Sequence, residues 1–328
     1  MIRRTFLLLG TALPLALTGC SRPSGPKRTR IAVIPKGTTH EFWKSVHAGA
    51  VKAGKELDVD VIWKGPLKED DLKAQIDVVQ SFTAQGVSGI VLAPLNDKAL
   101  GGAVKGAVGA NIPVVVFDSD LQGKDHVSFV ATDNVAAGRL GGEHLSKLLG
   151  GKGKVLLLRY QEGSASTQNR EQGFLEAVKS HPEIQIVSDN QYGGATTESA
   201  FSTSENLLSA QKAGEGGVNG VFCPNESTTF GMLLALQKAG LAGKIKLVGF
   251  DSSEKLVNGL KEGQIDGLVL QDPFNIGYLA VKTMARHLKG DKIEARIDTG
   301  ARMVTKENMS QPEIKELLSP DLQKWLGG

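Results

Sequence analysis

The sequence has few cysteines and aromatic side chains and no excess charge of one sign. Among 328 residues there are 2 Cys, 11 Phe, 3 Trp and 3 Tyr. Lys and Arg number 38 against 35 acidic residues, a net charge of +3, which argues against a polyanionic partner such as nucleic acid. The hydrophobic share of 41% is that of a soluble globular protein, and the length favours two domains.

Signatures of catalysis and metal binding are also missing. The sequence has neither a Gly-x-x-x-x-Gly-Lys-Ser/Thr loop nor a Gly-x-Ser-x-Gly elbow. His40-Glu41 begins like a zinc motif, but Lys44 stands where the second histidine would be. We therefore predict a binding protein and not an enzyme, with no metal ion and no cofactor.

The N-terminus has the pattern of an export signal. Arg3 and Arg4 precede an apolar run over 6–17, which is too short to span a membrane. We predict a signal peptide over residues 1–19, with the general secretory and twin-arginine routes both open. Leu17-Thr18-Gly19-Cys20 resembles a bacterial lipobox, which implies that Cys20 is lipidated and that residues 20–30 form a flexible tether. The expected location is the periplasm or cell surface, anchored to the membrane by lipid.

If Cys20 carries lipid, Cys223 stands alone and no intramolecular disulfide can form. The hydrophobic core must then hold the fold together, and about 300 mature residues can supply one. Cys223 itself ends the apolar run Gly-Val-Phe-Cys, which favours a buried strand residue over a nucleophile.

Short β-branched runs alternate with longer segments of helical period along the rest of the chain. This alternation is typical of βαβ units that form a parallel sheet with helices on both faces. The pattern starts near residue 31 and restarts near residue 154, so we expect two similar α/β domains. The expected strands are 31–35, 59–63, 89–93, 112–118, 154–160, 184–188, 218–223, 245–251 and 265–271. The expected helices are 41–56, 70–85, 97–110, 168–180, 198–209, 227–239 and 253–262.

The two halves repeat one local arrangement. Phe117-Asp118-Ser119 ends one expected strand of the first half, and Phe250-Asp251-Ser252 ends a strand of the second. In open α/β sheets, ligands bind at the carboxyl ends of the strands. If the domains face each other, Asp118 and Asp251 look into one cleft.

Further polar and aromatic residues follow the expected strands. Trp43 cannot share a helix face with its neighbour Phe42, so at least one ring should point towards the cleft. An aromatic ring packs against the C–H face of a sugar, and carboxylates accept hydrogen bonds from its hydroxyl groups. Core packing of Phe42 and a helix cap at Asn225 are the competing structural roles. The candidate ligand-binding residues are Lys36, His40, Phe42, Trp43, Asp118, Arg170, Asn225, Asp251 and Gln271.

Residues 31–305 resemble the periplasmic sugar-binding proteins of the ribose-binding type, whose fold is shared with sugar-responsive repressors. Repressors begin with a helix-turn-helix, and here an export signal takes its place. The matching motifs are Phe42-Trp43, Ala48-Gly49-Ala50, Ile112-Pro113-Val114, Thr132-Asp133-Asn134 with Gly138, Arg170-Glu171-Gln172-Gly173-Phe174, Asn225-Glu226, Val248-Gly249-Phe250-Asp251 and Gly263-Gln264-Ile265.

The resemblance implies the type I periplasmic binding protein fold, in which two similar doubly wound parallel-sheet domains are joined by a three-strand hinge. Residues 31–131 and 272–298 would form the N-terminal subdomain, and 132–271 and 299–328 the C-terminal one. Its crossover strands would lie near 131–133, 270–272 and 298–301. The resemblance assigns ligand contacts to Phe42, Trp43, Asp118, Arg170, Asn225, Asp251 and Gln271. It implies a monomer whose hinge closes around a monosaccharide and which delivers the sugar to an ABC transporter permease.

Departures from the ribose-type pattern leave the ligand open. Ser119 stands where that pattern has Arg, and His40 where it has Asn. Other stretches resemble relatives that bind autoinducer-2, in which Lys36, Asp118 and Gln168 would be contacts, although Thr167 departs from that group. A receptor that feeds a signalling partner is therefore an alternative, and a glycoside hydrolase using the two aspartates is a third. Residues 303–328 are expected to pack on the second domain.

Overall fold

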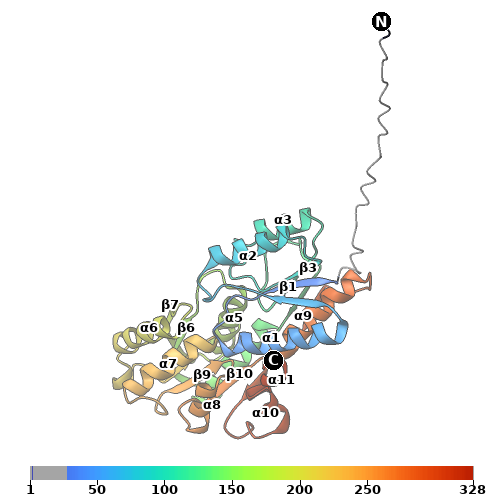
Figure 1. Cartoon of the computed structure of the whole chain (residues 1–328). Coiled ribbons are helices and arrows are strands. Elements are labelled where there is room, and N and C mark those ends of the chain that lie inside the picture. The colour runs from blue at the N-terminus through green and yellow to red at the C-terminus, as the bar shows by residue number, and fades with distance from the viewer. Residues whose placement is uncertain (1, 3–27, 328) are drawn as a thin grey trace.

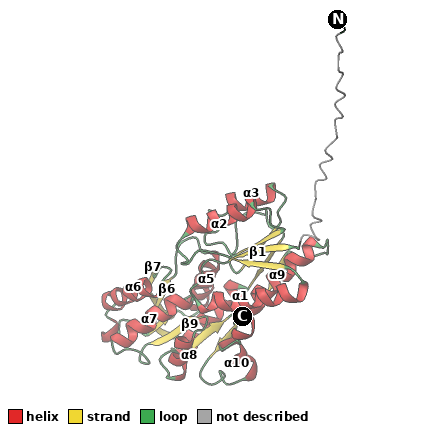
Figure 2. Cartoon of the chain, viewed as in Figure 1, coloured by secondary structure: helices red, strands yellow, loops and turns green. Residues whose placement is uncertain are grey.

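Two six-stranded sheets organise the chain in the computed structural model, which describes residues 2 and 28–327 (Figures 1 and 2). The first sheet has the order β11-β5-β4-β3-β1-β2 and is parallel throughout. Its strands are β1 (Arg30–Ile34), β2 (Asp60–Trp63), β3 (Gly89–Leu92), β4 (Val114–Phe117), β5 (Ser128–Ala131) and β11 (Arg296–Asp298).

The second sheet has the order β12-β10-β9-β8-β6-β7, and only its edge strand β12 runs antiparallel among the described strands. Its strands are β6 (Lys152–Arg159), β7 (Glu183–Tyr192), β8 (Gly220–Phe222), β9 (Lys246–Phe250), β10 (Gly267–Leu270) and β12 (Arg302–Val304). The prediction of two similar α/β domains with parallel sheets is confirmed.

Helices cover both faces of each sheet, because the central strands are apolar on both sides. In β1, Ile31 and Val33 face α1 (Glu41–Leu57) and α9 (Pro273–Leu288), while Ala32 and Ile34 face α2 (Leu72–Ala84) and α3 (Gly101–Gly109). The second sheet lies between α4 (Asn134–Leu148) and α5 (Ala165–Lys179) on one face and α6 (Thr197–Ala210), α7 (Glu226–Lys238) and α8 (Glu254–Lys261) on the other. A short 3₁₀ helix, Ala213–Glu215, follows α6.

Every strand and helix expected from the sequence is present within a few residues of its expected bounds. The pattern missed the strands β5, β11 and β12, the helices α4 and α9, and two short helices after residue 311. Helix α4 contains Gly138, Gly141 and Gly142, which weaken its helical signal. It is nevertheless a helix, because those glycines allow close packing against α5 and the second sheet.

The chain passes from one sheet to the other three times: after β5, after β10 and between β11 and β12. Hydrogen bonds join two of these crossing segments. Thr132 donates to the carbonyl of Gly300 at 3.1 Å, and the backbone N–H of Asp133 donates to Asp298 at 3.0 Å. The use of the crossings as a hinge, and the subdomain boundaries at residues 131, 271 and 298, remain predictions.

The C-terminal segment contacts both domains. Helix α10 (Pro312–Leu318) buries Ile314 in the core of the second domain. Helix α11 (Gln323–Leu326) then lies against α1 of the first domain. There the Trp325 ring is 6.3 Å from that of Phe274, and the Lys55 ammonium is 5.5 Å from the Trp325 ring centre. The prediction that residues 303–328 pack on the second domain is therefore wrong for α11, which packs on the first.

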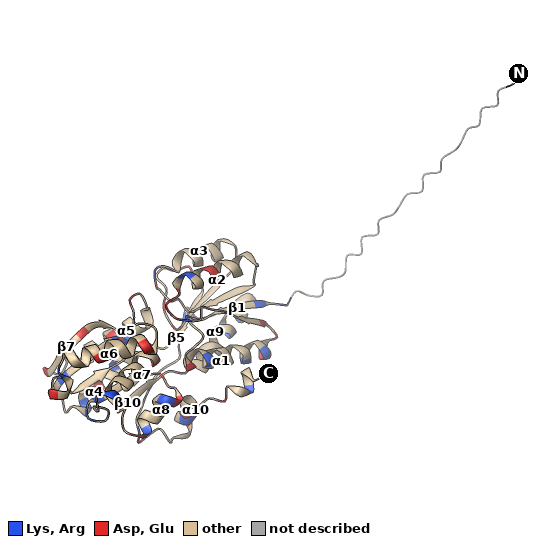
Figure 3. Cartoon of the chain, turned by 60° about the vertical axis from the view of Figure 1, so that its left-hand side comes forward, with Lys and Arg blue, Asp and Glu red and all other residues tan. Residues whose placement is uncertain are grey.

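Basic and acidic residues are interspersed along the helices of both domains (Figure 3). Among the described residues, no helix combines the length and hydrophobicity that a membrane crossing needs. Apart from residue 2, the predicted signal peptide lies outside the residues that the structure describes, as do Cys20 and residues 21–27 of the tether.

Candidate functional site

One cavity between the two domains is lined by all nine side chains that the sequence proposed for ligand binding. We call it the inner cavity. Its volume is about 30 Å³, which is room for only a few water molecules. The first domain contributes Lys36, His40, Phe42, Trp43 and Asp118, and the second contributes Arg170, Asn225, Asp251 and Gln271. Five further residues complete the lining: Glu69, Tyr160, Ser166, Thr167 and Glu226.

Asp118 and Asp251 occupy equivalent positions in the two domains. Each directly follows a central strand and has a left-handed backbone, with φ of 60° for Asp118 and 66° for Asp251. Each backbone N–H donates to the next strand of its sheet, at Val130 and Val269 respectively. Asp tolerates this conformation better than most residues, and such strain is concentrated at functional sites. The turn ends the strand abruptly and places each carboxylate at the cavity.

Lys36 is the cation beside Asp118. Its ammonium lies 3.2 Å from the Asp118 carboxylate, and both side chains are buried. The same ammonium donates to the hydroxyl oxygens of Ser164 and Ser166 across the domain boundary, at 3.2 and 3.0 Å. Ser119, which replaces the arginine of the ribose-type pattern, lies 3.3 Å from the Ser166 hydroxyl. Gln168 is not among the described residues that line the inner cavity.

Arg170 is buried between the strands and helices of the second domain, so its guanidinium does not form a surface salt bridge. Its guanidinium donates to the Asn134 side chain at 2.8 Å and to the Pro224 carbonyl at 2.9 Å, and lies 3.9 Å from Asp251. The guanidinium carbon of Arg170, Cζ, is 4.0 Å from the centre of the Phe250 ring. Burial raises the pKa of Asp251, although Arg170 and Gln271 partly offset this rise. The site therefore holds Asp251 in place without fully compensating its desolvation.

Gln271 lines the cavity and carries a buried acceptor atom without a partner among the described residues. Its side-chain N–H donates to Asp251 at 2.7 Å, so its orientation is fixed. Its carbonyl oxygen is buried and has no hydrogen-bond partner among the described residues. A buried acceptor without a donor costs free energy, so a ligand hydroxyl that reaches this oxygen would bind favourably.

Phe42 and Trp43 both line the cavity and also belong to the core of the first domain. Their rings meet edge to face with centres 4.9 Å apart. Trp43 donates through its indole N–H to Glu69 at 2.6 Å, which fixes the ring. Phe42 and Trp43 therefore have the competing core role and also line the cavity.

Asn225 caps α7, and this helix cap is the competing structural role that the sequence analysis named for it. Its side-chain oxygen accepts from the backbone N–H of Thr228 at 3.3 Å. The same side chain lines the inner cavity, so the cap also positions it towards the cleft.

Glu69 is a site residue that the sequence analysis missed. It lies before α2 in the run Lys68-Glu69-Asp70-Asp71, which has the composition of a solvated loop. Instead it is 6% exposed and lies 2.6 Å from both His40 Nδ1 and the Tyr160 hydroxyl. Burial opposes its ionisation, but the charge of His40 prevails and lowers the pKa of Glu69 to about 2. Burial likewise opposes the charge of His40, whose pKa Glu69 raises to about 9. At neutral pH the two form a buried ion pair.

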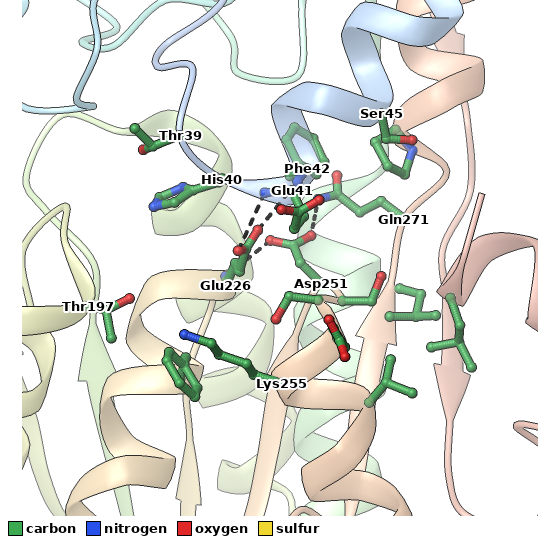
Figure 4. A pocket seen from close by; sticks show the side chains of 18 of the residues that line it. Thr39, His40, Glu41, Phe42, Ser45, Thr197, Glu226, Asp251, Lys255 and Gln271 are labelled. Atoms are coloured by element: carbon green, nitrogen blue, oxygen red, sulfur yellow. Dashed lines mark hydrogen bonds between the residues drawn. The ribbon is translucent and has the colours of Figure 1, made fainter. Parts of the chain in front are cut away.

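Glu226 was also missed as a site residue. It is the first residue of α7, and its carboxylate faces the N-terminus of α1 in the other domain (Figure 4). It accepts from the backbone N–H groups of Glu41 and Phe42 at 3.5 and 3.3 Å. Burial raises the pKa of Glu226 to about 7, against the opposing charge of His40. Helix N-termini attract such carboxylates through their free N–H groups.

Known proteins are similar to this chain over most of its length. Residues 31–292 match the family described as Periplasmic binding protein domain. The ribose import binding protein of Salmonella typhimurium is 29% identical over 297 residues, which cover 89% of this chain and 96% of that protein.

Two solved structures are similar in fold and sequence. A carbohydrate transporter solute-binding protein from Agrobacterium radiobacter, in complex with D-arabinose, is 35% identical with a TM-score of 0.85; the match covers 89% of this chain and 99% of that one. An ABC transporter solute-binding protein from Agrobacterium vitis with bound D-fucose is 35% identical with a TM-score of 0.83, and the match covers 88% and 100%.

Proposed function

This chain belongs to the family of periplasmic binding protein domains, and from that premise we propose that it captures a monosaccharide between its two domains and delivers it to an ABC transporter permease. The relatives described above are sugar-binding transport proteins, which agrees with the prediction of a binding protein that is not an enzyme. The family is extracytoplasmic, as predicted.

The observation that carries the proposal is the convergence of nine complementary side chains on the inner cavity. Sugar hydroxyl groups both donate and accept hydrogen bonds. Asp118, Asp251 and the free oxygen of Gln271 supply acceptors, while Lys36 and Arg170 supply donors. The aromatic pair described above offers apolar surface for the C–H face of a sugar ring. We infer that these residues contact the ligand directly.

Entry of the sugar requires the domains to separate. Ligand pockets usually enclose about 300–1,000 Å³, whereas the inner cavity has about 30 Å³. Hydrogen bonds from Lys36 to Ser166 and from Tyr160 to Glu69 join its two sides directly. We infer that the three crossing segments act as a hinge, and that a bound sugar replaces part of these contacts and selects the closed form.

We also propose that the protein is a monomer tethered to the membrane through lipid on Cys20. The lipobox and the export signal before it support this proposal. Cys20→Ser should move the protein from the membrane fraction to the soluble fraction, as seen by fractionation and immunoblotting. Cys223→Ser serves as the control, since Cys223 is buried in the second domain. Membrane retention of Cys20→Ser would contradict lipid anchoring.

A receptor for autoinducer-2 or a sugar, coupled to a signalling partner, is the second candidate. The position of Lys36 in the inner cavity, beside Asp118, favours it. The position of Gln168 away from the inner cavity speaks against it, because Gln168 would be a contact in that group.

A thermal-shift screen tests the proposed function. Mature protein is unfolded and refolded to remove any co-purified ligand, then heated with pentoses, hexoses, deoxyhexoses and autoinducer-2. A ligand at 100 times its Kd adds about 2.7 kcal/mol of stability, which moves the midpoint by a few degrees. A shift with a neutral sugar supports the proposal, and a shift with autoinducer-2 alone supports the signalling candidate. No shift with any compound rejects both.

Asp251→Ala should weaken the binding identified in this screen by more than about tenfold, because a buried charged partner of the ligand is lost. The melting temperature without ligand should stay nearly unchanged, since burial of this carboxylate is only partly compensated. Asp120→Ala is the matched control, because Asp120 is an exposed carboxylate two residues after Asp118. A large loss of stability in Asp251→Ala would make Asp251 a structural residue.

A further inference from the structure

Glu69 is held by side chains from both domains, and its partners line the inner cavity. Its carboxylate oxygen Oε1 lies 2.6 Å from the indole nitrogen of Trp43 and 2.6 Å from His40 Nδ1, both in the first domain. Its other oxygen, Oε2, accepts from the hydroxyl group of Tyr160 in the second domain at 2.6 Å. All three partners belong to the lining of the inner cavity. Glu69 therefore connects the second domain with an aromatic and a cationic side chain of the candidate site.

The second domain contacts Glu69 through two successive residues. Tyr160 directly follows β6, and its neighbour Gln161 donates through its side-chain N–H to the backbone carbonyl of Glu69 at 3.0 Å. Tyr160 is itself fixed within the second domain, because its backbone N–H donates to the Glu171 carboxylate at 3.1 Å. Arg159 donates to the same carboxylate at 2.7 Å, and Glu171 is fully buried on α5. The second domain thus presents the Tyr160 hydroxyl group to Glu69 in a fixed position.

The contact between Tyr160 and Glu69 joins a neutral donor to a charged acceptor. Burial raises the pKa of Tyr160 well above its ordinary value, so the phenol keeps its proton and donates a hydrogen bond to the ionised Glu69. Tyr160 is fully buried and Glu69 is 6% exposed. A buried carboxylate oxygen that loses its donor is unfavourable. Because the two residues belong to different domains, we expect the proposed opening of the hinge to separate them.

We propose that Glu69 is a positioning residue of the sugar site, and that Tyr160 completes this role when the domains close. This inference rests on the proposed function, because it requires a sugar in the inner cavity and a hinge that closes. With Tyr160 in place, Glu69 holds the Trp43 ring and the His40 side chain in fixed positions beside the ligand. Without Tyr160, the Glu69 carboxylate turns towards water, and both side chains lose their shared partner. Closure therefore sets the geometry of the site as well as enclosing the sugar.

Tyr160→Phe tests the inference, because it removes the hydroxyl group and keeps the buried ring. Calorimetry with the sugar identified in the thermal-shift screen should show an affinity about tenfold lower, the loss expected from one hydrogen bond to a charged group. Stopped-flow fluorescence should place this loss in the dissociation rate, because the contact forms only after the sugar has entered and the domains have closed. Tyr192→Phe is the matched control, since Tyr192 ends the neighbouring strand β7 and is exposed.

Unchanged affinity in Tyr160→Phe, with the sugar still bound by the unmodified protein, would overturn the inference and leave the proposed function intact. Failure of the unmodified protein to bind any sugar would reject both. Gln161→Ala provides a second variant in case Tyr160→Phe does not fold. It removes the other hydrogen bond from the second domain to Glu69 and should lower the affinity about threefold. Normal affinity in this variant would likewise count against the inference.

A double-mutant cycle separates positioning from direct contact between Tyr160 and the sugar. If Tyr160 acts through Glu69, Tyr160→Phe should weaken binding less in a Glu69→Gln background than in the unmodified protein. Additive losses would assign the Tyr160 hydroxyl group to the sugar and overturn the positioning role. NMR adds a spectroscopic readout: the indole N–H resonance of Trp43, assigned with Trp43→Phe, should shift in sugar-bound Tyr160→Phe and stay in place in Tyr192→Phe. An unchanged resonance in Tyr160→Phe would contradict transmission through Glu69.

Discussion

At the scale of single residues, the site is a set of buried charges that stabilise one another. His40 and Glu69 form one ion pair, and Lys36 and Asp118 form another. Buried charges are tolerated only when they are paired and hydrogen bonded. The pairs hold their side chains in fixed positions, which favours the recognition of one pattern of ligand hydroxyl groups.

The charge of His40 depends on Glu69. Burial alone would lower the pKa of His40, and the carboxylate 2.6 Å away raises it to about 9. The substitution Glu69→Gln removes the main negative charge that counteracts the effect of burial on His40. We therefore expect the pKa of His40 to fall by more than about one unit. NMR titration of the imidazole measures this value, with exposed Asp70→Asn as the control on the same loop. An unchanged pKa of His40 would contradict the pairing.

Glu226 should make stability depend on pH. Its pKa is about 7 in the folded protein and near the ordinary 4.5 when unfolded, so the folded state holds the proton more tightly. The resulting loss in the free energy of unfolding is absent below pH 4.5, grows as the pH rises to 7, and is complete above pH 7. Glu226→Gln should therefore melt at a higher temperature than the unmodified protein at pH 8, and at the same temperature at pH 4.

Thermal melts across this pH range provide the measurement. Glu254→Gln is the control, because Glu254 is also the first residue of a helix but is exposed. A difference between Glu226→Gln and the unmodified protein that does not change with pH would show that Glu226 is not the titrating group.

At the scale of elements, one helix pair in each domain packs through glycines. A Cβ at Gly49 of α1 would lie 1.9 Å from the carbonyl oxygen of Phe274, where α9 begins. A Cβ at Gly138 of α4 would lie 2.0 Å from the carbonyl oxygen of Arg170 on α5. The second pair bears directly on the site, because the close approach sets the position of Arg170.

Gly138→Ala should therefore damage both stability and binding. The added methyl group pushes α4 and α5 apart, which costs about 1–3 kcal/mol and moves Arg170 away from Asp251. Thermal melts and calorimetry with the screened sugar measure the two effects. Gly106→Ala on α3 is the control, since a Cβ there meets nothing within 4 Å and should stabilise the helix slightly. Normal sugar affinity in Gly138→Ala would show that the helix spacing does not position Arg170.

At the scale of the whole molecule, the C-terminal segment bridges the two domains. It leaves the second sheet at β12, packs α10 on that domain and brings Trp325 of α11 against Phe274 and Lys55 of the first. These contacts are made with the domains close together. We expect the proposed opening of the hinge to break these contacts, so that they stabilise the closed arrangement.

Deletion of residues 323–328 should shift the molecule towards the open form. We expect a larger radius of gyration by small-angle X-ray scattering and a sugar affinity lower by a few fold, because less of the protein is in the binding-competent form. The melting temperature should change little, as α11 contributes no residue to a buried core. Gln323→Ala is the control. Unchanged scattering and affinity after the deletion would contradict a bridging role.

The sequence by itself determined the fold and most of the site. Alternating β-branched and helical segments predict parallel sheets, because the period of the apolar residues is local information. The repeated Phe-Asp-Ser segments predict paired carboxylates at equivalent strand ends, because chain connectivity fixes which edge of a sheet carries them.

Only the tertiary structure decided the roles of Glu69, Glu226 and the C-terminal segment. Both glutamates have the local sequence of exposed residues, one in a charged loop and one at a helix start. Glu69 is buried and Glu226 half-buried where the opposite domain covers them, and their pKa values follow from this burial and from charges distant in the sequence. Burial and pairing across a domain boundary depend on how the domains meet, which no local pattern encodes.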